Sequence, residues 1–230
     1  MKTITLWDLP TRLFHWTLVA AVAGSVATGL IGGGLMEWHG RLGFLVAALL
    51  GFRLVWGIAG ATHSRFLSFL PWPGSVIDYL KGRWQGVGHN PLGAFSVFGM
   101  LAVLGFQIGS GLFANDDIAF KGPYNILVGS NWESLATSLH KDNAWLIGLL
   151  VAMHLSAIAF YRFVKKDNLV KPMIDGRKEV PESVPDPRPG RPVALVVALV
   201  FAAAVGWLAS GEIAKHLAPP PPPPVETPNW

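Results

Sequence analysis

Two histidines stand out in an apolar stretch of this sequence, residues 139–163 (LHKDNAWLIGLLVAMHLSAIAFYRF). His140 lies near the start of the stretch and His154 lies well inside it. In a helix their separation of 14 residues corresponds to ~21 Å of rise and to a rotation about 40° short of four full turns, so the two imidazoles share one face at two depths. Ionisable side chains inside a membrane helix are costly and usually functional. The spacing suggests one axial ligand for each of two stacked haems.

A single helix supplies only half of such ligation, so matching histidines are needed on other helices. His15 and His39 lie in the first and second apolar runs. If the runs cross the membrane alternately, His15 matches the depth of His154, and His39 matches that of His140. Four histidines at two matched depths favour two bis-histidine haems in a helical bundle. Taken singly, each histidine is equally compatible with a packed or hydrogen-bonded side chain. A zinc site is disfavoured, because neither pair has a third ligand nearby and the sequence has no HExxH motif.

The composition is that of an integral membrane protein. Of the 230 residues, 51% are hydrophobic and only 14% are charged, against about 25% charged in soluble domains. Cysteine is absent, which excludes disulfides, cysteine-ligated iron–sulfur clusters and covalently attached c-type haem. Any redox cofactor must therefore be held without a covalent bond, most simply through histidine.

The apolar runs predict an all-α fold with five transmembrane helices. Four form the bundle, at about residues 11–33, 38–61, 91–113 and 139–163, and a fifth follows at about 193–210. The first run is too long for a signal peptide and is interpreted as a retained helix. Residues 73–80 are expected to form a short interfacial helix. The predicted units are a haem-binding core (1–166), a cytoplasmic linker (167–192), the fifth helix (193–211) and an external polyproline tail (212–230).

Basic residues are distributed unevenly between the two sides of this five-helix alternation. Most lie before the first helix, between the second and third, and between the fourth and fifth. The positive-inside rule therefore predicts a cytoplasmic N-terminus and an external tail. The net charge of +4 follows this topology and does not indicate nucleic-acid binding.

Several local motifs resemble one known family. WDLPTRLFHW, WHGRLGF, GFRLVWG and the H-x13-H of residues 140–154 are similar to the prokaryotic cytochrome b-561 type, which includes the membrane cytochrome b subunit of nickel–iron hydrogenases. The resemblance covers about residues 5–170. It implies a four-helix core with two haems b in the bacterial inner membrane, moving electrons between quinone and a redox partner. Carried over residue by residue, the implied ligands are His15, His39, His140 and His154.

Three arginines are candidates for contacts with haem propionates. Arg53 lies 14 residues after His39, which places it on the same helix face at the depth of the inner haem. No acidic residue is expected in the first three helices, so propionates are candidate partners for Arg53, Arg41 and Arg12. Snorkelling to lipid headgroups is the alternative. The remaining histidines, in predicted loops or the tail, are expected to be solvated: His63, His89 and His216. Tryptophans are expected mainly at the membrane interfaces, among them Trp7, Trp16, Trp38, Trp132 and Trp145.

The leading functional hypothesis is a transmembrane electron conduit between the quinone pool and an external carrier, such as a c-type cytochrome or another redox subunit. A hydrogenase membrane anchor is a variant of it. The alternative is a stand-alone oxidoreductase acting on a small species such as superoxide at the outer haem. The acidic loop at residues 114–138 argues against steering of an anion. The fifth helix and tail are expected to serve assembly with a partner in an oligomeric complex.

Overall fold

The structure is a computed structural model that describes residues 1–118 and 120–217. The proline run and the C-terminal VETPNW, for which a docking role is predicted, lie outside the described residues. Within the described residues, five helices are long and apolar enough to cross a membrane. The all-α membrane fold is thereby confirmed. These five helices are α1 (Leu9–Ile31), α2 (Met36–Ala59), α4 (Pro91–Gly111), α5 (Ser130–Phe163) and α7 (Pro192–Ala209).

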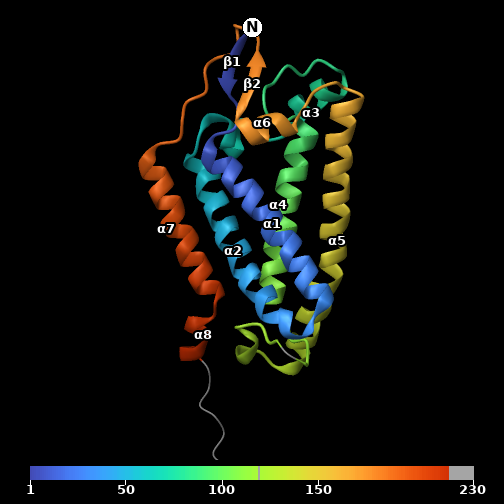
Figure 1. Cartoon of the computed structure of the whole chain (residues 1–230), viewed down its shortest axis with the longest axis vertical. Coiled ribbons are helices and arrows are strands. Elements are labelled where there is room, and N and C mark those ends of the chain that lie inside the picture. The colour runs from blue at the N-terminus through green and yellow to red at the C-terminus, as the bar shows by residue number, and fades with distance from the viewer. Residues whose placement is uncertain (119, 218–230) are drawn as a thin grey trace, which may run out of the picture.

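Shorter elements gather at the two ends of these helices (Figure 1). We call the end that carries α3, α6 and the strands the strand end, and the opposite end, with residues 112–129 and α8, the loop end. The predicted interfacial helix at 73–80 is present as α3. The short elements are β1 (Lys2–Thr5), α3 (Pro73–Leu80), α6 (Val170–Asp175), β2 (Arg177–Val180), α8 (Glu212–Leu217) and the 3₁₀ turns η1 (Gly33–Leu35), η2 (Thr62–Ser64), η3 (Phe66–Ser68) and η4 (Asn125–Leu127).

Local sequence explains where α1 begins and ends. The side chain of Asp8 accepts a hydrogen bond from the backbone N–H of Thr11 at 3.3 Å, and Pro10 occupies the first turn, where its missing N–H costs nothing. The helix stops at Gly32, whose φ of +71° favours glycine. A capped start and a glycine stop therefore set the first span.

Helix α5 is longer than the sequence predicted. It begins at Ser130 rather than near residue 139 and continues for 34 residues, or ~51 Å, well beyond the ~30 Å of a hydrocarbon core. The hydrophobic pattern begins only at residue 139, because the first turns are polar. Glu133 in the first turn suits the positive end of the helix dipole and favours a helix start here.

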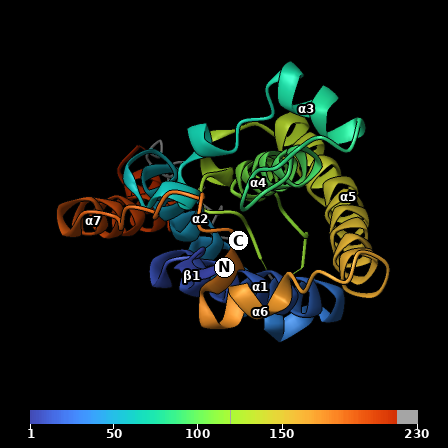
Figure 2. The ribbon, with the colours of Figure 1, turned by 90° about the horizontal axis from the view of Figure 1, so that it is seen from above.

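Helices α1, α2, α4 and α5 surround a common axis, and α7 lies outside them (Figure 2). Helix α2 packs against α1, α4 and α7, while α5 packs against α4. The main apolar cluster contains Phe14, Phe52, Trp56 and Ala198, from α1, α2 and α7. The packed core thus lies on the α7 side of the bundle, away from α5.

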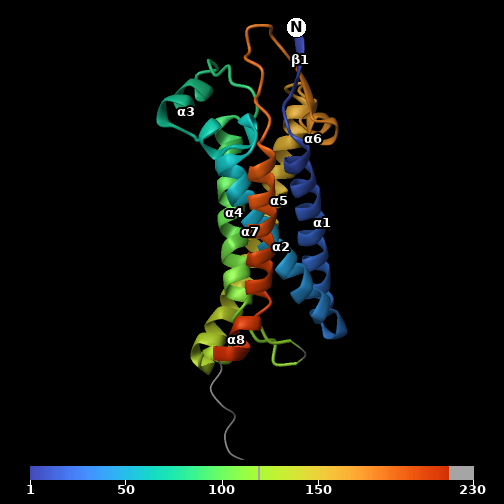
Figure 3. The ribbon, with the colours of Figure 1, turned by 90° about the vertical axis from the view of Figure 1, so that its left-hand side faces the viewer.

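Helix α7 lies along the flank of α2 (Figure 3), as the sequence suggested. Small residues allow the close approach. A Cβ placed on Gly51 would lie 3.0 Å from a methyl carbon of Val205, and one on Gly206 would lie 3.1 Å from Cβ of Ala48. Such contacts are typical of helix pairs in lipid, where close packing is the main attraction.

The segment between α5 and α7 is not a plain surface linker. It contains α6 and β2, and β2 pairs antiparallel with β1 in the register Lys2↔Val180 to Thr5↔Arg177. Its later part is held to the end of α2, because the N–H of Thr62 donates to the carbonyl of Arg188 at 3.1 Å. The sequence did not predict this strand pair, because β1 and β2 have only four residues each and are too short to give a periodic pattern.

Candidate redox site

The loop-end half of the bundle brings His39 and His140 together. Their ring centroids are 5.9 Å apart, and their planes are nearly perpendicular, at 81°. Two imidazoles that bind one metal ion at ~2.0 Å from each nitrogen have centroids roughly 6 Å apart. The two side chains, from α2 and α5, are therefore spaced as two ligands of one metal ion would be.

Backbone carbonyls orient both rings. Nδ1 of His39 lies 2.8 Å from the carbonyl oxygen of Ser25, and Nδ1 of His140 lies 3.0 Å from that of Gln107. Histidine ligands commonly donate one ring N–H to a carbonyl, which fixes the tautomer and leaves the other nitrogen for the metal. Both Nε2 atoms are therefore the candidate ligand atoms.

Two glycines make room for these rings. A Cβ on Gly29 would lie 3.0 Å from Cε1 and Nδ1 of His39. A Cβ on Gly111 would lie 2.8 Å from Cε1 of His140. A Cβ at Gly29 would press on the imidazole of His39, and a Cβ at Gly111 would force the imidazole of His140 or its surroundings to shift.

A polar pair on α4 and α5 was missed by the sequence reasoning. The side-chain amide of Gln107 lies 3.1 Å from Nε2 of His140, and its oxygen accepts a hydrogen bond from Asn143 at 2.7 Å. Asn143 also donates to the carbonyl of Val103 at 3.1 Å. The signal was available, since amide side chains inside apolar helices are unusual.

The strand-end half brings His15 and His154 near each other. The two side chains, from α1 and α5, are close enough for their charges to interact. Nδ1 of His15 is buried without a hydrogen-bond partner among the described residues. The ring of Trp16 packs edge-on against that of His15, with centroids 5.1 Å apart. A buried imidazole with an unused nitrogen is suited to bind a metal ion.

These residues fit haem b. Each pair joins α5 to a different helix, and the rings of the loop-end pair are close enough to bind one metal ion between them. Haem iron would supply one-electron chemistry at each position. The protein's part is to fix the imidazoles, exclude water and hold the two positions apart along α5.

The three candidate arginines contact groups of the protein itself. Arg41 pairs with Glu37 at 2.5 Å on the exposed first turn of α2, so the expectation of no acidic residue in these helices was wrong. Arg12 donates to the carbonyl of Ile174 at the end of α6. That position is the negative end of a helix dipole, which suits a guanidinium.

Arg53 is deeply buried, at 4% exposure. It donates to the carbonyl of Ser64 at 2.9 Å and lies over the ring of Phe66, 4.5 Å from its centroid. The carboxylate of Asp8 is near enough to attract it. That carboxylate also accepts hydrogen bonds from Trp56 at 3.0 Å and from the hydroxyl of Ser64 at 2.9 Å. Arg53 thus belongs to a buried polar network at the strand end.

The expectation that His63 and His89 are solvated was wrong. The ring of His89 packs between Trp7 and Phe69, with centroids 4.6 Å from each. Trp7 is itself buried rather than in an interface belt. Burial lowers the pKa of His89 to about 3, and nearby Arg53 contributes to the shift. Burial also lowers the pKa of His63, whereas His216 is exposed as expected. A loop position in sequence gave no sign that the chain folds back over these rings.

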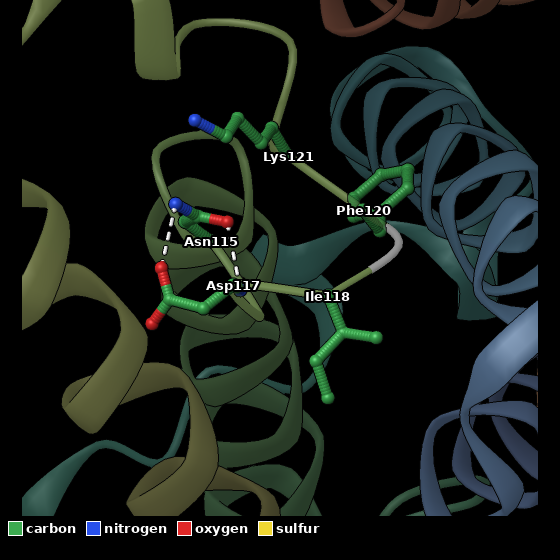
Figure 4. A pocket seen from close by; sticks show the side chains of 5 residues that line it. All are labelled: Asn115, Asp117, Ile118, Phe120 and Lys121. Carbon is green, nitrogen blue, oxygen red and sulfur yellow. Dashed lines mark hydrogen bonds between the residues drawn. The ribbon is translucent and has the colours of Figure 1, made fainter.

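At the loop end, a cluster of polar side chains lies beside the His39–His140 pair: Asn115, Asp117, Glu133 and Thr137. Figure 4 shows Asn115 hydrogen-bonded to Asp117, with the side chain of Lys121 lying apart from this pair. Asn115 donates to Asp117 at 3.0 Å and to Glu133 at 2.6 Å. The ring of Phe120 abuts Gly40, where a Cβ would lie 2.6 Å from it. This surface is acidic and adjoins the residue next to His39.

A bundle of membrane-spanning helices with facing histidines from different helices is the architecture of a membrane cytochrome b. The family model for prokaryotic cytochrome b561 matches residues 6–176. The chain therefore belongs to the prokaryotic cytochrome b561 family. It is a haem-binding, electron-transferring membrane protein, and its haem is of the b type.

Curated relatives share most of their length with this chain. The "Probable Ni/Fe-hydrogenase 1 B-type cytochrome subunit" of Escherichia coli (strain K12) is 24% identical over 215 residues, covering 74% of this chain and 88% of the relative. "Probable Ni/Fe-hydrogenase B-type cytochrome subunit" proteins of Rhizobium leguminosarum bv. viciae and Cupriavidus necator are 23% and 25% identical. They cover 77% and 76% of this chain and 89% and 87% of their own length. No solved structure matches significantly.

Proposed function

We propose that this chain conducts electrons across the bacterial inner membrane through two non-covalent haems b. His15 and His154 ligate the inner haem, and His39 and His140 ligate the outer haem. The observation that supports this best is the 5.9 Å separation of the His39 and His140 rings, each with Nδ1 directed at a backbone carbonyl. The electrons pass between membrane quinone and an external redox partner.

The orientation follows from the charges. Positive residues of β1, α6 and β2 gather at the strand end, together with Lys81 and Arg83 just after α3, and we therefore place this end in the cytoplasm. The loop end is then external. The His39–His140 pair lies next to the external surface, where a partner could exchange electrons with it.

The partner that we propose is a hydrogenase, because the relatives carry that assignment in their names. The acidic loop beside the outer pair suits a docking surface with basic groups. It disfavours the alternative of a stand-alone enzyme for superoxide, since the loop's charge would repel an anion. Helix α7 packs outside the bundle and leaves both histidine pairs to the other helices.

The decisive measurement is the haem content of the purified chain together with a reductive titration. Two haems b per chain with two midpoint potentials are expected. A single haem per chain would contradict the assignment of two ligand pairs. Isolation of the untagged chain from its native membrane, with the co-purifying proteins identified, tests the partner.

A further inference from the structure

A group of three side chains with buried nitrogen atoms lies at the strand end and belongs to neither proposed ligand pair. It consists of Arg53, His63 and His89, from α2, η2 and the segment before α4. His89 is fixed between two aromatic rings, and His63 lies beside Gly88, where a Cβ would be 3.7 Å from Nδ1 of His63. Three segments far apart in sequence thus place these side chains together.

The two imidazoles have unused hydrogen-bonding atoms. Nδ1 of His89 and Nε2 of His63 are both buried without a partner among the described residues. Leaving a buried polar group unpaired costs about 1–3 kcal/mol, and most such groups in proteins are satisfied. Each neutral imidazole carries one N–H, so both rings can donate a hydrogen bond to a ligand that accepts one, such as a carboxylate.

The group offers hydrogen-bond donors rather than a surplus of positive charge. His89 is close enough to Arg53, His154, His15 and His63 for each to act on it electrostatically. The carboxylate of Asp8 balances the charge of Arg53 and is itself engaged by the N–H of Thr11 and by other donors. What remains for a ligand here is therefore the hydrogen-bonding capacity of the two imidazoles.

We propose that His63 and His89, beside Arg53, form a carboxylate-binding site that holds a propionate of the inner haem. The inference rests on the proposed ligation by His15 and His154, which lie near His89. An imidazole N–H donates to the carboxylate. Hydrogen bonds from these donors partly offset the negative charge of the propionate, and this raises the midpoint potential of the inner haem.

The test compares variants of the full chain in detergent. His89→Phe keeps an aromatic ring between Trp7 and Phe69 but removes both ring nitrogens, whereas His89→Gln retains a donor. His216→Phe, at an exposed site on α8, is the matched control. The readouts are the midpoint potential of each haem and the redox-difference infrared spectrum with ¹³C-labelled haem propionates. If His89→Phe does not accumulate, His63→Phe is measured in the same way.

We expect His89→Phe to lower the potential of the inner haem and to shift its propionate bands, with the outer haem unchanged. His89→Gln should fall between His89→Phe and the wild type, and His216→Phe should match the wild type. Unchanged potential and bands in His89→Phe, with quinol oxidation retained, would mean that water alone fills the site, and would overturn the proposal. Loss of quinol oxidation without a change in potential or bands would overturn it in favour of a quinone site. A wild-type chain without the inner haem would overturn the proposed function as well.

Discussion

The contact between Gly111 and His140 offers a sharp test of the loop-end haem site. In Gly111→Ala the new Cβ would lie 2.8 Å from Cε1 of His140 and 3.0 Å from its Nδ1. Carbon atoms in good contact are ~3.5–4.0 Å apart, so the ring must shift by about 1 Å. Metal–ligand distances tolerate only ~0.2 Å. We therefore expect Gly111→Ala to weaken binding of the outer haem and to leave binding of the inner haem unchanged.

The magnitude follows from the cost of overpacking. Forcing an extra carbon into a packed site costs about 1–3 kcal/mol, which corresponds to roughly 5- to 150-fold weaker haem binding. Gly105→Ala on the same helix is the matched control, since a Cβ there meets nothing within 4 Å. Gly105 lies inside α4, where alanine favours helix formation by up to ~1 kcal/mol, and Gly111 is the last residue of α4, where the gain is smaller, so neither variant is expected to lose general stability through helix propensity.

The assay is the haem-to-chain ratio after washing in detergent, combined with a potentiometric titration that resolves the two haems. Gly111→Ala should lose the outer component and keep the inner one, and Gly105→Ala should keep both. The reasoning is refuted if Gly111→Ala retains both components at unchanged potentials, or if both variants lose haem equally.

Three further outcomes are expected. Acid–acetone should extract all haem, because no cysteine is present to hold it, and haem remaining on the polypeptide would contradict non-covalent binding. In difference spectra, His15→Ala and His154→Ala should remove one haem component. His39→Ala and His140→Ala should remove the other component. If His15→Ala and His39→Ala remove the same component, the proposed pairing is contradicted. Truncation after Pro192 should leave both spectral components but lower the melting temperature, because α7 contributes to the apolar core, and loss of either haem would show that α7 supports the ligand helices.

The membrane fold was predictable because lipid imposes simple rules on sequence. A span needs about 20 apolar residues, and all five runs found on that basis are helices in the structure. The start of α5 was missed because a helix that leaves the membrane becomes polar without ceasing to be helical.

The features that the sequence did not reveal depend on contacts between distant segments. The pairing of β1 with β2 joins residues near 4 to residues near 178, and four-residue strands carry no usable periodicity. The burial of His89 depends on Trp7 and Phe69 folding over it from two other segments. The partners of Arg53 likewise come from η2 and the N-terminus.

The histidines on α5 have a consequence for how the two proposed haems depend on each other. His140 and His154 stand on one rigid helix, so their separation along the membrane is fixed by helical rise alone. Their proposed partners, His15 and His39, lie on α1 and α2, so a change in one of these helices can move one partner without moving the other. Asn143, one turn after His140, holds α5 to α4 through Gln107 and the carbonyl of Val103. Changes that move α5 as a whole should therefore disturb both haems together, whereas changes confined to α1 or α2 should disturb one.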